Sequence, residues 1–149
     1  DGMNADKTVQ QLMEQIELPI ELTLTQEHGK VSWTVKSIWE YYATWFHFDR
    51  TTELYHVPQS AIYSDILEVA DAGALTSKAD AYVSADEPLK ALHLVDIVLG
   101  AKEGNEAALK VRKNALQILL DRAESGSKNS YEIYWLNYRL RDTVEKLSR

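Results

Sequence analysis

The spacing of apolar residues constrains this chain more than any other feature. Only three prolines and six glycines occur in 149 residues, and between them apolar side chains recur every three or four positions. This period places one apolar stripe along a helix of 3.6 residues per turn, whereas a strand would need alternation at every second residue. The sequence therefore predicts an all-α fold of about seven helices.

Start and stop signals bound the expected helices. Pro19 ends the first, because its ring disfavours helical geometry in the residue before it. Ser60 is expected to cap the third helix, and Pro88 suits the first turn of the fifth. We expect helices at about 8–17, 31–47, 60–69, 75–85, 87–100, 105–124 and 130–147.

Residues 75–108 resemble one tetratricopeptide-type helical hairpin. The small side chains of Ala79 and Ala91 stand where the two helices would approach each other. Stacked solenoids need about three such repeats, and only one convincing unit is present. An ordinary α-hairpin is the alternative interpretation.

Residues 28–50 hold three tryptophans, two tyrosines and two phenylalanines. Wound as a helix from Val31, seven apolar residues share a stripe roughly 120° wide, which we expect to face the core. The stripe consists of Val31, Val35, Ile38, Trp39, Tyr42, Trp45 and Phe46. Trp33 falls nearly opposite, beside Lys36 and Glu40, where an isolated helix would expose it to water.

A second aromatic cluster lies on the last expected helix. Tyr131, Tyr134, Trp135 and Tyr138 share one side, whereas Leu136 and other aliphatic residues face elsewhere. A helix that is apolar over most of its girth is either central in the fold or packed against a partner. Tyrosine and tryptophan suit interfaces because they combine large area with a polar group. These four residues, together with Trp39 and Tyr41, are the candidate dimer or partner surface.

Charge and hydropathy exclude two kinds of partner. The net charge is −7, and no run of Lys and Arg exceeds two residues, so the chain lacks the basic patch that nucleic-acid binding needs. The longest apolar run, at 89–101, is interrupted by Lys90, His93 and Asp96. A membrane span needs about 20 apolar residues, so none is predicted.

Catalytic motifs are missing from the sequence. The chain has no cysteine, and His28, His47, His56 and His93 form no ligand pair of the kind that zinc hydrolases use. Nucleophile-elbow, P-loop and dinucleotide-binding motifs are also lacking. We predict no catalytic residue and no metal site in this chain; a stand-alone lyase or hydrolase that uses an Asp or Glu with His93 is a minor alternative.

Six short segments form an ordered set. They are Met3-Asn4, Thr8, IELPIEL at 16–22, HGKVSWTVKSIWEYYATWF at 28–46, residues 52–54, and AESGSKNSY at 123–131. In this order and spacing they resemble the helical dimerisation domain of the metallo-β-lactamase-fold alkyl sulfatases. The resemblance covers nearly the whole chain.

This resemblance carries implications for organisation and partners. In that family the helical domain follows a zinc-binding hydrolase domain, often precedes a sterol-carrier-like domain, and holds two subunits together. It implies that residues 1–149 are a single helical dimerisation domain excised from a larger metallo-hydrolase. The expected partners are a second copy and the parent's catalytic domain, which would carry the zinc, and no cofactor is expected in this chain.

The resemblance also implies which residues face the catalytic domain. Where the sulfatases have a histidine that reaches the sulfate, this chain has Trp33, and a second such position is Trp45. An indole N–H only donates and never ionises, so it cannot replace an imidazolium as an anion partner. The Asp-Gly that follows in the family is replaced by His47-Phe48. Trp33, Trp45 and His47 are therefore the candidate interdomain or substrate-facing residues.

Two expectations remain open at this stage. Trp33 either packs against the parent's catalytic domain, and is then partly exposed in this chain, or folds back onto residues 22–24. The chain as a whole is either a non-catalytic dimerisation module or, as the alternative, a monomeric tetratricopeptide-like adaptor that binds a peptide or partner helix.

Overall fold

The computed structural model describes residues 1–45 and 50–149 and confirms an all-α fold with seven α-helices over this range. The helices are α1 (Val9–Gln15), α2 (Val31–Ala43), α3 (Tyr63–Val69), α4 (Ala72–Ser84), α5 (Pro88–Ala101), α6 (Glu106–Ser125) and α7 (Ser130–Leu147). Short 3₁₀ helices lie at Met3–Ala5, Ile20–Leu22, Thr51–Leu54 and Gln59–Ile62.

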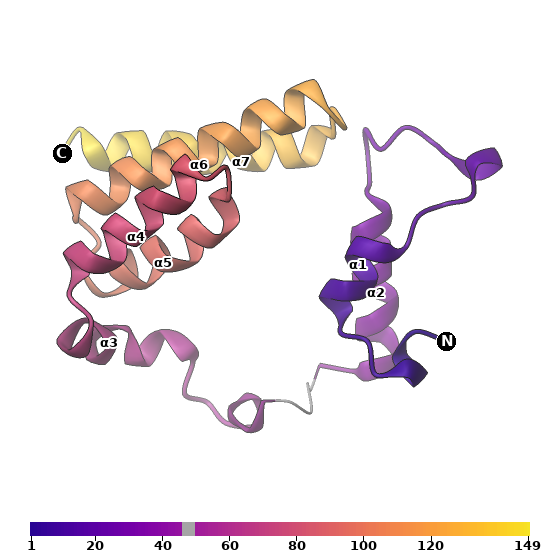
Figure 1. The fold of residues 1–149 in the computed structure, drawn as a ribbon, viewed down its shortest axis with the longest axis horizontal. Coiled ribbons are helices and arrows are strands. Elements are labelled where there is room, and N and C mark those ends of the chain that lie inside the picture. Colours follow the sequence, from indigo (N-terminus) through magenta and orange to yellow (C-terminus); the bar gives the residue numbers. More distant parts are fainter. Residues whose placement is uncertain (46–49) are drawn as a thin grey trace.

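The helices form two groups (Figure 1). Helices α4 to α7 pack side by side in a bundle, with α3 against α5, and α1 pairs with α2 in a hairpin that stands apart. The chain between α2 and α3 spans the distance between the two groups. We call α1 and α2, with the residues around them at 1–43, the N-terminal arm.

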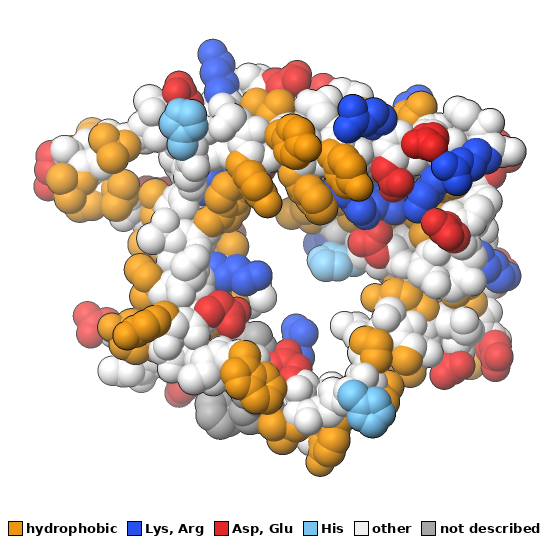
Figure 2. All heavy atoms as spheres, turned by 180° about the vertical axis from the view of Figure 1, so that it is seen from behind, with side chains coloured by type: hydrophobic (Ala, Val, Ile, Leu, Met, Phe, Trp, Pro, Cys, Tyr) orange, Lys and Arg blue, Asp and Glu red, His pale blue; other side chains and the backbone are white. Residues whose placement is uncertain are grey.

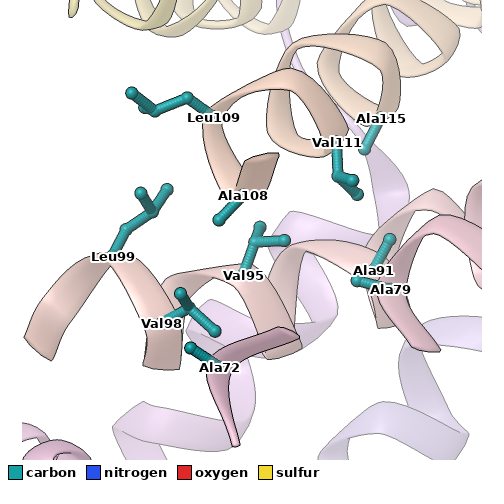
Figure 3. Close-up of a cluster of buried hydrophobic side chains, with 10 residues drawn as sticks. All are labelled: Ala72, Ala79, Ala91, Val95, Val98, Leu99, Ala108, Leu109, Val111 and Ala115. Atoms are coloured by element: carbon teal, nitrogen blue, oxygen red, sulfur yellow. The ribbon is translucent and has the colours of Figure 1, made fainter. Parts of the chain in front are cut away.

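Small side chains bring the bundle helices close together. Ala79 of α4, Ala91 and Val95 of α5, and Ala108 of α6 are fully buried. Figure 3 shows side chains of this cluster converging from the three helices. Ala79 and Ala91 therefore occupy the α4–α5 contact, as their size predicts, whereas the tetratricopeptide likeness of this hairpin stays a prediction.

Polar caps set the starts of four helices. The side chains of Asp71, Asn105 and Asn129 accept hydrogen bonds from backbone N–H groups in the first turns of α4, α6 and α7, and Thr8 forms a capping box at α1. Such a cap contributes about 0.5–2 kcal/mol. The Asp71 cap explains why α4 begins at Ala72, three residues earlier than expected.

Two predicted boundaries are wrong. Ser60 does not cap a helix; it lies within the 3₁₀ turn Gln59–Ile62, and α3 starts at Tyr63. Helix α2 ends at Ala43 instead of continuing to 47, because Thr44 takes a φ of 64°, which a β-branched residue rarely adopts. His47 lies outside the described residues.

We predict that Ala79→Leu destabilises the bundle by about 1–3 kcal/mol, because the α4–α5 contact has no room for an isobutyl group. Urea denaturation measures the free energy of unfolding. Ala81→Leu is the matched control, since Ala81 is exposed on the same helix and its substitution is expected to cost less than about 0.5 kcal/mol. Equal midpoints for the two variants would contradict the packing described here.

Candidate interaction surfaces

A polar contact joins the N-terminal arm to the bundle. Asn129 is fully buried: its Oδ1 accepts from the Glu132 N–H (2.9 Å), and its Nδ2 donates to the Gln26 carbonyl oxygen (2.6 Å). The Ser130 N–H donates to the Glu27 carbonyl oxygen over 2.7 Å. We call the contact of residues 26–33 with residues 129–132 the joint.

Charged and aromatic side chains complete the joint. Lys30 Nζ lies 2.5 Å from Glu132 Oε2, and both side chains are largely buried. The ring of Trp33 meets the ring of Tyr131 edge to face, with centroids 6.0 Å apart. Lys30 Nζ also lies 5.7 Å from the centre of the Trp33 ring. The ion pair is therefore shielded from water better than an ordinary surface pair.

Trp33 is half-buried at this joint. Its ring contact is with Tyr131, a residue of α7, and the segment 22–24 is largely exposed. The indole thus joins the arm to α7 within the chain. Two segments that carry the family resemblance, 28–46 and 123–131, meet at this point.

The aromatic side chains of α7 form one exposed surface. Tyr131, Tyr134, Trp135 and Tyr138, which we call the aromatic ridge, are 65%, 67%, 49% and 44% exposed. Trp135 and Tyr138 stack with ring centroids 5.7 Å apart. Leu136, on the opposite side of α7, packs into the bundle core. The ridge therefore points away from the interior of the chain.

Hydrophobic side chains gather on the face of the molecule that Figure 2 shows, along the upper border of an opening between the arm and the bundle. The Trp33–Tyr131 contact carries the aromatic surface of α7 across to the arm. The ridge and the start of α2 thus form a continuous apolar surface, which is unusual for a chain that stays alone in water.

The predicted core face of α2 is wrong. No described residue of α2 is buried, and Ile38, Tyr42 and, beyond the helix, Trp45 are exposed. Phe46, which was expected to extend this face, lies outside the described residues. The stripe lines a groove of about 520 Å³ between α2, α1 and the first residues of the chain. Only α1 covers it, and α1 has seven residues, too few to bury a stripe of this length.

Trp39 and Tyr41 differ in their surroundings. Trp39 is half-buried in the groove, and its Nε1 is buried without a hydrogen-bond partner among the described residues. Tyr41 is exposed and meets Tyr42 edge to face, with ring centroids 5.2 Å apart. The arm thus presents a second apolar surface, on the side of α2 away from the joint.

Two further searches concern the described part of the chain. No group of three or more His, Cys, Asp or Glu residues there has the arrangement of a metal site. None of its helices combines the length and the apolar character that crossing a bilayer requires.

Sequence reasoning missed the residues that build the joint. Asn129 precedes a helical pattern, so its role as an N-cap was open to prediction from sequence. Its bond to Gln26 was not, because 103 positions separate the two residues. Lys30 and Glu132 carried no signal that distinguishes them from solvated surface charges.

This arrangement defines a helical interaction module: a packed bundle and an arm that together leave two aromatic surfaces uncovered. The chain belongs to the alkyl sulfatase dimerisation family, whose family model matches residues 8–140. No curated protein and no solved structure matches the chain. Family membership assigns it to the dimerisation modules and confirms the resemblance found in the sequence.

We predict that Asn129→Asp loosens the arm and leaves the bundle intact. The carboxylate still caps α7 but cannot donate to the Gln26 carbonyl oxygen. Hydrogen exchange of the backbone amides at 26–33 is expected to rise about tenfold, with α4 to α6 unchanged.

Asn105→Asp is the matched control for this experiment. Asn105 caps α6 through Ala108 and lies outside the joint. The role of the joint is contradicted if the Asn129→Asp and Asn105→Asp variants show the same exchange at 26–33.

Proposed function

We propose that this chain is the non-catalytic dimerisation module of an alkyl-sulfatase-like zinc hydrolase, in which it holds two subunits together and lies beside the catalytic domain. Family membership supports self-association. In this proposal the zinc and the hydrolytic residues belong to a domain outside residues 1–149.

The accessible surface of the chain is the observation that carries this proposal. A compact monomer of 17.0 kDa exposes about 7,700 Å², whereas this chain exposes 10628 Å². The excess is roughly 2,900 Å², and obligate dimers bury about 2,000–5,000 Å² in total over both subunits. The chain therefore has enough surplus surface for a second copy and a neighbouring domain.

The aromatic ridge is the surface that we assign to the second copy. It lies opposite the buried side of α7, so no helix of the same bundle covers it, and the joint holds its first residue, Tyr131, in place. Two ridges facing each other across a twofold axis would form an isologous contact. Tyrosine and tryptophan are the side chains that such contacts favour.

The second apolar surface is assigned to the catalytic domain. Trp45 is 70% exposed just beyond α2, at a position that faces the zinc domain in the family pattern. We propose that Trp45 and His47 contact that domain, with Trp39 and Tyr41 beside them. Trp33 lies where this surface and the ridge approach each other.

We predict that Trp135→Glu weakens self-association about 100-fold or more, because two buried carboxylates would face each other across the twofold axis. Light scattering over a hundredfold dilution measures the mass in solution. Val69→Glu is the matched control: Val69 is an exposed apolar residue at the end of α3, far from the ridge in Figure 1.

Two results would count against this assignment. A Trp135→Glu variant that keeps the wild-type dimer mass at every dilution would exclude the ridge as the contact. Wild-type chain that stays monomeric at every concentration would contradict self-association of residues 1–149.

A further inference from the structure

A pocket outside both aromatic surfaces lies between α5, α6 and α7. Its volume is about 430 Å³, and it is half open to solvent. Three cationic side chains line it, Arg112 from α6 and Arg139 and Lys146 from α7. Two carboxylates, Asp96 of α5 and Glu103 of the turn after α5, lie on the same wall.

Arg112 is the unusual member of this group. Its exposed fraction is only 7%, yet no hydrogen bond or ion pair links its guanidinium to another described residue. A guanidinium carries five N–H donors and cannot lose its charge at physiological pH. Burying such a charge without a partner is strongly unfavourable, so a native structure that contains one calls for a ligand.

The neighbouring carboxylates do not satisfy this charge. Glu103 is paired with Lys146, whose Nζ lies 2.8 Å from Glu103 Oε1. Asp96 forms no ion pair with either arginine over the described residues. Partial burial raises the pKa of the Asp96 carboxyl, although Arg139 and His93 act in the opposite direction. Its negative charge is therefore the weaker one in the pocket.

Arg139 is the second unsatisfied cation. Its guanidinium lies 5.6 Å from the centre of the Trp135 ring, a contact that leaves its N–H donors available, and no carboxylate of the described chain pairs with it. Arg112 and Arg139 together give the pocket a local excess of positive charge in a chain whose net charge is −7.

We infer that this pocket binds a small tetrahedral oxyanion of the phosphate or sulfate class between the guanidinium groups of Arg112 and Arg139. The planar fork of N–H donors matches two oxygens of such an anion, and these charge-assisted bonds are the strong ones in proteins. The bound anion neutralises Arg112 and stabilises the packing of α5, α6 and α7. This site is independent of the proposed self-association.

Calorimetric titration of the purified chain with inorganic phosphate tests the inference, at an ionic strength held constant with sodium chloride. We expect saturable binding with a Kd in the micromolar to low millimolar range, and a Tm that rises with phosphate concentration because only the folded chain binds. Chloride alone should give no saturable response.

Arg112→Met is the decisive variant. It should abolish phosphate binding and, in phosphate-free buffer, raise the Tm by roughly 2–4 °C, because an apolar chain of similar length removes a buried unpaired charge. Arg112→Lys keeps the charge but loses the fork, and is expected to bind at least about tenfold more weakly.

Arg141→Met is the matched control, since Arg141 is exposed on α7 and outside the pocket, and this variant should bind phosphate like the wild type. The inference is overturned if the wild type shows no saturable binding, or if Arg112→Met still binds. A lower Tm for Arg112→Met in phosphate-free buffer would also overturn it, because the buried charge would then already be satisfied.

Discussion

The buried amide of Asn129 is the interaction on which the arrangement of the two helix groups depends. One rigid, planar group caps α7 with its oxygen and holds the Gln26 carbonyl with its nitrogen. The start of α7 and the segment before α2 therefore cannot move independently. Because neither bond is exposed to water, each is stronger than its surface equivalent. The position of Trp33 against Tyr131 follows from this geometry.

The bundle and the arm are stabilised in different ways. Alanine and valine side chains let α4, α5 and α6 approach closely, so the bundle has a core of its own. The arm has one buried apolar residue on α1, Leu12, and none on α2. Most of its apolar area stays accessible until another surface covers it. The arm is thus the part of the chain whose stability depends most on association.

The sequence predicted the helices better than it predicted their exposure. Periodicity gave the seven helices, and residue size gave the contact at Ala79 and Ala91. The stripe on α2 was equally clear, yet Ile38 and Tyr42 are exposed, because a pattern shows which side of a helix is apolar and not which molecule covers it. Arg112 was invisible for a related reason: its burial results from the packing of three helices, which no local pattern encodes.

The separation of Asn129 from Gln26 also bears on the order of folding. Closing the joint brings together residues 103 positions apart, whereas the bundle helices meet mainly through neighbours in the chain. Loop-closure entropy therefore places the docking of the arm after the formation of the bundle. A newly synthesised chain would present its aromatic ridge before its arm is in place, so the first encounter between subunits need not wait for the arm.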